Sequence, residues 1–186
     1  MTDPEEFLLK INGLFGQQPV IRKIDSTKPG LPPVSCFIYH DVPDAGMTTA
    51  VTYGLSEAEH PDWKFGKPEL AVTVKSVAES WALAMAFFAE QYRGDQSFTY
   101  GSLFMLDEPI GTESEMSGFL VFTAATVGEH PLKIELPTKT VNLAGMYPIY
   151  AGETELIRQI GLQAFWELPG LDLLDVKRAD MSKHGD

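Results

Sequence analysis

The stretch that most constrains the fold runs from Pro68 to Gly94, where a strand pattern passes directly into a helix pattern. From Glu69 to Lys75, apolar residues alternate with polar or small ones at a period of two, which is typical of a half-buried strand. Residues 81–89 are apolar on every face of a helix, but the run is too short to cross a bilayer. We therefore expect a strand followed by a helix that is buried in the core.

Both ends of this helix carry local signals. Ser76 precedes Glu79 in an S-x-x-E pattern, which predicts a capping box that starts the helix at Ser76. Gly94 predicts the end, because glycine adopts the left-handed conformation without a steric penalty. These signals indicate architecture and carry no information about chemistry.

A second helix is expected near the N-terminus. Asp3, Pro4 and Glu6 form a helix-start signature, and apolar residues then fall on one face as far as Gly16. Strand patterns follow over residues 19–24, 34–40, 47–53, 97–106, 116–126, 132–136, 139–143 and 146–150. The strand at 116–126 is apolar on both faces, so we place it centrally in the sheet.

The pattern closes with a helix over residues 153–168, which Pro169 and Gly170 end. Strands outnumber helices and short turns can join several neighbours, which favours an α+β fold. We expect a mixed, largely antiparallel sheet covered by a buried central helix and by flanking N- and C-terminal helices. With 186 residues, 44% of them apolar, the chain suits one domain, placed at 1–170, and a C-terminal tail at 171–186 that frays at its end.

The chain is acidic, with 26 carboxylate and 14 basic side chains and a net charge of −12. This charge disfavours nucleic acid and anionic membranes as partners and favours a basic protein, although acidity also simply keeps a protein soluble. The N-terminus lacks a secretion signal and no segment reaches the length of a membrane span, which predicts a cytoplasmic protein. Cys36, the single cysteine, lies among apolar neighbours and is expected to be a buried, inert thiol.

The polar loop from Gly54 to Lys67 is the most suggestive surface in the sequence. It concentrates acidic side chains beside an aromatic anchor, and the neighbouring strand ends in a tyrosine. We expect a basic protein partner to bind here, with Trp63 as anchor, through Tyr53, Glu57, Glu59, Asp62 and Trp63. The alternative is that Trp63 packs into the core and the carboxylates belong to an ordinary solvated loop.

The sequence contains no convincing catalytic set. Nucleophile-elbow and phosphate-loop patterns are missing. His40-Asp41 and His130 could each contribute to an acid–base pair, but a lone histidine at a strand end is more often a polar cap to the strand. The cluster Glu57, Glu59, His60 and Asp62 has the spacing of neither a zinc site nor a calcium loop. We therefore expect no catalytic residue, no metal and no cofactor. The opposing hypothesis is a hydrolase or small-ligand-binding protein in which the acidic loop 57–62 meets His130 in a pocket.

Four stretches, taken together and in order, resemble the suppressor-of-fused domain family. The first two are the Y-G-L-S strand end at residues 53–56 and the P-x-E-L strand that runs into an aromatic-rich helix at residues 68–92. The third comprises Phe98, Gly101, Leu106, Pro109 and Ile110, whose spacing departs slightly from the family pattern. The fourth is the P-I-Y-x-x-E junction at residues 148–153, with Leu156 and Gly161 beyond it.

This resemblance spans residues 48–168 and implies a non-enzymatic α+β domain that binds another protein. In animals such a domain forms the N-terminal part of a repressor that sequesters zinc-finger transcription factors. In bacteria, similar single domains are proposed as immunity proteins against polymorphic toxins, and the single domain here fits the bacterial type better. An acidic adaptor that does not neutralise a toxin would share the same features.

Overall fold

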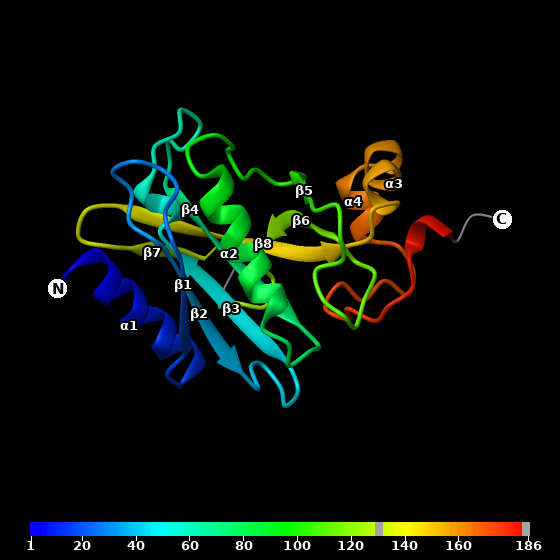
Figure 1. The fold of residues 1–186 in the computed structure, drawn as a ribbon, viewed down its shortest axis with the longest axis horizontal. Helices are drawn as coiled ribbons and strands as arrows, with labels where there is room; N and C mark the ends of the chain where they lie inside the picture. The colour runs from blue at the N-terminus through cyan, green and yellow to red at the C-terminus, as the bar shows by residue number, and fades with distance from the viewer. Residues whose placement is uncertain (129–131, 184–186) are drawn as a thin grey trace.

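The computed structural model describes residues 1–128 and 132–183 (Figure 1). The helices are α1 (Asp3–Phe15), α2 (Ser80–Tyr92), α3 (Glu153–Ile160) and α4 (Leu162–Trp166), with 3-10 turns at Leu55–Glu57 and Met181–Lys183. The strands are β1 (Val20–Ile24), β2 (Val34–His40), β3 (Thr48–Tyr53), β4 (Lys67–Val74), β5 (Leu103–Met105), β6 (Gly118–Thr123), β7 (Lys133–Glu135) and β8 (Thr140–Ile149).

Over the described residues, the strands form one sheet in the order β1-β2-β3-β4-β8-β6-β5, with β7 also paired to β8. Each pair is antiparallel except β4 with β8, which is parallel. The expected α+β class and the mixed, largely antiparallel sheet are therefore confirmed. Neighbouring strands β2 with β3 and β7 with β8 pair as hairpins, in agreement with the short turns expected between neighbouring strand patterns.

Helices cover both faces of the sheet. Along β2, Cys36 and Ile38 pack in the cluster that contains α2, whereas Phe37 and Tyr39 pack with α1, because neighbouring side chains point to opposite faces. A third cluster, which includes Leu120, lies beneath α3 and α4. Figure 1 shows α2 across the middle of the sheet, with α1 and the α3–α4 pair toward opposite ends.

Helix α2 is buried on its inner face only. Trp81 and Met85 are fully buried, and the helix ends at Tyr92, shortly before Gly94 with its positive φ of 82°. Phe87, however, is 42% exposed, because no element covers the outer side of α2 in the described part of the chain. The expectation that this helix is buried on every face is therefore wrong for its outer side, where Phe87 lies.

The predicted capping box at Ser76 is also wrong. Helix α2 starts four residues later, at Ser80. The Ser76 hydroxyl instead donates to the carboxylate of Glu113, which also accepts a hydrogen bond from Trp81 Nε1 at 2.9 Å. The local pattern predicted that the Ser76 hydroxyl would cap the helix, but in the structure this hydroxyl is hydrogen-bonded to Glu113, which is distant in sequence.

Strand β4 is buried on both faces, which corrects the half-buried strand that its alternation indicated. The polar members of the alternation are hydrogen-bonded inside the protein: the Thr73 hydroxyl lies 2.8 Å from that of Thr49 and 2.7 Å from that of Thr126. Buried polar groups are tolerated when they find such partners. β4 is the middle strand of the main sheet path, whereas the strand at 116–126, shortened to β6, lies one strand from the edge.

Two further strand assignments differ from expectation. The strand expected over residues 97–106 shrinks to β5, because Phe98 and Gly101 have positive φ values of 55° and 93° that no extended strand allows. The strands expected at 139–143 and 146–150 are one strand, β8. Gly145 marks a close approach inside β8, since a Cβ there would lie 2.6 Å from Thr123 O.

The terminal helices need smaller adjustments. The N-terminal helix is confirmed and ends at Gly16, but the carboxylate that reaches back at its start belongs to Glu5, which accepts from the Thr2 N–H at 2.8 Å. The helix expected over residues 153–168 breaks into α3 and α4 at Gly161, whose φ is 89°. The apolar residues keep a helical spacing on both sides of Gly161, so the sequence pattern did not reveal that two helices are present.

The segment after residue 170 packs against the rest of the protein. Val176 is fully buried in the α2-side cluster, and Arg178 is 7% exposed. The boundary at residue 170 remains a prediction, and the expected fraying concerns residues 184–186, which lie outside the described residues. No helix in the described ranges has the length and apolarity needed to span a membrane.

Cys36 is buried as expected, and this burial raises the pKa of its thiol to about 12.

Candidate protein-binding surface

The loop between β3 and β4 begins at a turn that a buried carboxylate holds. Glu69 is fully buried, and its oxygens accept hydrogen bonds from the Thr52 hydroxyl, the Gly54 N–H and both the N–H and the hydroxyl of Ser56, at 2.7–2.9 Å. Burial raises the pKa of Glu69, and these hydrogen bonds oppose that rise. Gly54 has no room for a side chain, since a Cβ would lie 3.0 Å from Pro33 O.

Glu69→Gln is expected to lower the free energy of unfolding by about 1–3 kcal/mol, because the amide group turns a donor toward backbone N–H groups that need an acceptor. The loop should also become more accessible, which amide hydrogen exchange at Gly54 and Ser56 would report. Glu155→Gln, at a side chain that is 65% exposed on α3, is the matched control. Unchanged stability together with unchanged exchange would mean that Glu69 does not hold the turn.

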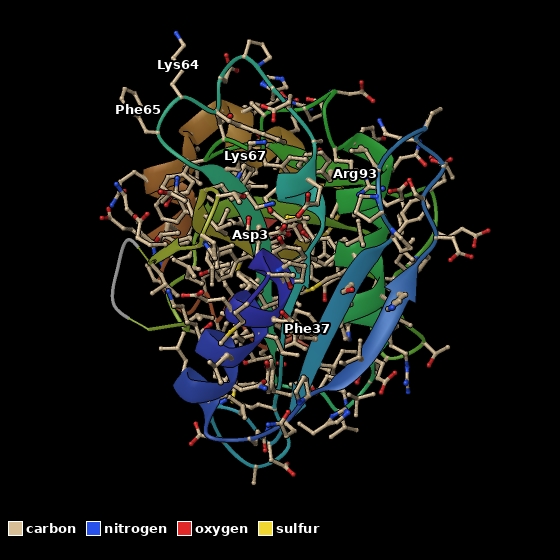
Figure 2. All side chains as sticks on the ribbon, turned by 90° about the vertical axis from the view of Figure 1, so that its left-hand side faces the viewer. Asp3, Phe37, Lys64, Phe65, Lys67 and Arg93 are labelled. Atoms are coloured by element: carbon tan, nitrogen blue, oxygen red, sulfur yellow. The ribbon has the colours of Figure 1, made fainter. Side chains whose placement is uncertain are left out.

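The far end of the loop is also fixed. Trp63 Nε1 donates to Ser97 O at 2.9 Å, and Asn142 Nδ2 donates to Phe65 O at 3.3 Å. Gly66 has φ 127°, and a Cβ there would lie 2.4 Å from Asn142 Nδ2, so this close approach requires glycine. The exposed part of the loop therefore projects from a rigid base, and Figure 2 shows Lys64 and Phe65 pointing outward at its tip.

The structure separates the five residues predicted to bind a partner. Tyr53 and Glu57 line a hollow of about 550 Å³ beside the start of α1, and the Tyr53 hydroxyl donates to Glu57 Oε1 at 2.7 Å. Lys139 Nζ lies 2.6 Å from the same oxygen and 5.1 Å from the centroid of the Tyr53 ring. Burial acts to raise the pKa of Glu57, but the hydrogen bonds from Lys139 and Tyr53 outweigh it and hold that pKa below its ordinary value.

The other three predicted residues face solvent more openly or line a different hollow. The Glu59 side chain is 85% exposed and pairs with Lys67, and the Asp62 side chain is 62% exposed. Trp63 is half-buried against the α2-side cluster, with its ring 5.5 Å from that of His60. Tyr53 and Glu57 therefore form one pair, and Glu59, Asp62 and Trp63 form a second, more exposed set.

Among the described residues, the side chains considered for metal or acid–base chemistry do not gather at one site, although His60 Nδ1 lies 3.8 Å from Asp62 Oδ2. Within residues 1–128 and 132–183, no three His, Cys, Asp or Glu side chains are arranged to hold a metal ion. His40 Nε2 lies 3.6 Å from Glu79, and the Asp41 carboxylate accepts a hydrogen bond from Gly46 N. His130 lies outside the described residues.

Sequence reasoning missed an apolar groove next to this loop. The groove has a volume of about 570 Å³, and Trp63, Phe65, Phe98, Tyr100 and Leu143 contribute to its lining. Phe65 is 85% exposed and Tyr100 is 51% exposed. The sequence signalled Phe65 as the second aromatic residue of the polar loop, but Tyr100 joins it only because the chain turns back at Phe98.

The motifs that carry the family resemblance are internal supports. Y-G-L-S and P-x-E-L meet at the Glu69 carboxylate, so two motifs separated in sequence are one hydrogen-bonded unit. The P-I-Y-x-x-E junction likewise meets Arg178, which binds Glu153 and Pro148 O. These buried residues maintain the fold.

Comparisons with known proteins agree with these motifs. The family model described as Suppressor of fused protein (SUFU) matches residues 30–179. A crystal structure of a SUFU homolog from Neisseria gonorrhoeae is similar, with 18% identity, a TM-score of 0.68 and 93% of each chain covered. No curated protein sequence matches the chain.

Two further solved structures share the fold. Drosophila Suppressor of Fused has 15% identity and a TM-score of 0.64 over 97% of this chain, which spans about half (51%) of the Drosophila protein. A chain of the Sufu-Fu complex has 15% identity and a TM-score of 0.64, with 96% of this chain and 92% of that chain covered. Because the family model covers most of the sequence and the buried motifs form its internal supports, this chain belongs to the suppressor of fused (SUFU) family.

Proposed function

We propose that this protein is a non-enzymatic binding domain of the cytoplasm that sequesters a basic protein partner. The observation that carries the proposal is the loop between β3 and β4, which is fixed at both ends and presents Glu59, Asp62 and part of Trp63 to solvent. A rigid loop loses little conformational entropy on binding, and exposed carboxylates steer a cationic partner toward it. One of the similar solved structures is that of a Sufu-Fu complex, which supports protein binding as the general role.

Tyr53 and Glu57 would complete this surface at the neighbouring hollow, where their contact with Lys139 keeps them in place. Trp63 would contribute an apolar contact rather than a deep anchor, since its indole N–H is already bonded to Ser97 O. A basic toxin that the domain neutralises is the partner that best fits the net charge of −12. The same charge argues against nucleic acid and anionic membranes.

The test uses the Glu59→Gln/Asp62→Asn double variant and a partner captured from the source cells. Association of this variant with the partner should slow by about tenfold at low salt and lose much of its salt dependence, because long-range steering depends on exposed charge. Stopped-flow or surface-based kinetics at several salt concentrations measure both effects.

The matched control is Asp95→Asn/Glu155→Gln. It removes the same charge from side chains that are each 65% exposed elsewhere, one of them paired with a lysine as Glu59 is. Equal kinetics of the two double variants would move the binding surface away from this loop. Capture of no basic protein by the folded wild type would contradict sequestration itself.

A further inference from the structure

The groove beside the loop has walls from four separate segments. The loop contributes Trp63 and Phe65, the turn before β5 contributes Phe98 and Tyr100, and strands β7 and β8 contribute the remaining wall. Asn142 and Leu143 from β8 lie at the junction of β4, β7 and β8. A hollow built on sheet strands and a fixed loop keeps its shape, so it can select what it binds.

The apolar lining reaches solvent to an unusual degree. Phe65 and Tyr100 are the two most exposed aromatic side chains in the described part of the chain. The Tyr100 ring is held edge-on by Phe122 at 5.3 Å between centroids, whereas the Phe65 ring packs against no aromatic ring of a described residue. Exposed aromatic residues around a hollow are typical of protein interfaces, where they supply most of the binding energy.

The charge around the groove is opposite to that of the whole protein. None of the residues that line it is acidic, and Lys133 is among them. Lys64 directly precedes Phe65 in the sequence. Neither lysine forms an ion pair with a described residue, although the chain carries a net charge of −12. Asn142 Oδ1, also at the groove, is buried and has no hydrogen-bond partner among the described residues.

We propose that this groove binds a segment of the protein partner that presents an apolar side chain next to a carboxylate. The apolar side chain would lie between Phe65 and Tyr100, and the carboxylate would reach Lys133 in the groove or Lys64 beside Phe65. Charge complementarity favours this occupant, because a basic segment would meet Lys133 and no carboxylate in the groove. The inference rests on the proposed function and adds that the partner, basic overall, carries an acidic apolar segment.

The experiment selects short linear peptides from a random display library on the wild-type protein, after depletion on Phe65→Ala. Enriched peptides should combine an aromatic or large aliphatic residue with a nearby Asp or Glu. Synthetic peptides of the enriched sequence should bind about tenfold more weakly to Phe65→Ala and to Lys64→Glu/Lys133→Glu. In NMR spectra of the wild type, the signals of the Trp63 indole N–H and of the Asn142 side-chain amide should change their chemical shifts when the peptide binds.

Matched controls are Phe87→Ala, at an exposed aromatic residue on α2, and Lys23→Glu/Lys177→Glu, at two exposed lysines elsewhere. These variants should bind the peptides as the wild type does. Enrichment of basic peptides, or of none that depend on Phe65, would overturn the inference. So would a dimer in sedimentation experiments that Phe65→Ala dissociates, since the groove would then hold a second copy of this chain.

The two proposals fail separately. If the selected peptides bind in the groove but the Glu59 and Asp62 substitutions do not change the rate of association with the partner, the proposed acidic surface is wrong and the proposal for the groove stands. If the acidic residues steer a partner but no acidic apolar peptide binds, only the groove inference is lost.

Discussion

Replacing Trp81 by alanine is expected to lower the free energy of unfolding by about 3–5 kcal/mol, because it opens a cavity in the centre of the α2-side cluster. Trp81 is fully buried, and its indole N–H also supplies the 2.9 Å hydrogen bond to Glu113. Losing it leaves the Glu113 carboxylate with one fewer donor near the start of α2. Urea unfolding followed by circular dichroism measures the change.

Two variants separate the cavity from the hydrogen bond. Trp81→Phe fills most of the volume but cannot donate to Glu113, so its loss of stability should be clearly smaller than that of Trp81→Ala. Phe87→Ala removes an aromatic ring from the exposed side of the same helix and should cost less than either. If Trp81→Ala unfolded at the wild-type urea concentration, α2 would not be the core helix described above.

Replacing Arg178 by methionine is expected to be similarly costly, about 3–5 kcal/mol, because it leaves the Glu153 carboxylate buried without its counter-charge. Arg178 Nη1 lies 2.6 Å from Glu153 Oε1 and Arg178 Nη2 lies 2.8 Å from Oε2, and the Glu153 side chain is fully buried. The guanidinium also lies 5.5 Å from the centroid of the Tyr150 ring. This ion pair ties the C-terminal segment to the start of α3.

The double variant Arg178→Met/Glu153→Gln should recover part of the loss, because it removes the uncompensated charge. Hydrogen exchange should show that residues 171–183 open first in the single variant, while β2–β4 keep their protection. Should the single and double variants be equally stable, the charge pair would not be the source of the effect. Retained protection of the C-terminal segment would show that its other contacts, such as the burial of Val176 and the hydrogen bond from Lys75 N to Leu174 O, are sufficient to hold it.

The two proposed contact areas give the partner a distinctive charge pattern. Exposed Glu59 and Asp62 favour a cationic surface, while the groove with Lys64 and Lys133 favours a carboxylate next to an apolar side chain. A partner with both features would bind in one orientation only, because the reversed orientation places like charges together.

The sequence by itself determined the features that depend on neighbours along the chain. The N-terminal helix with its glycine end and the hairpins of β2 with β3 and β7 with β8 follow from contacts a few residues apart, so local patterns predicted them. The family resemblance was readable for a related reason. Its motifs are the buried supports around Glu69 and Glu153, whose side chains must fit fixed partners.

The tertiary structure alone decided the features that depend on distant partners. Ser76 lost its capping role to Glu113, and the alternating polar residues of β4 were buried because Thr49 and Thr126 met them from other strands. The candidate site also depends on partners that are distant in sequence. Trp63 is half-buried with its indole N–H bonded to Ser97 O, and Phe65 and Tyr100 line the same groove. The periodicity of apolar residues shows that one face of a segment differs from the other. A polar side chain, however, is buried only where folding brings it a hydrogen-bond partner. Such a partner can be distant in sequence, so only the tertiary structure decides which polar side chains are buried.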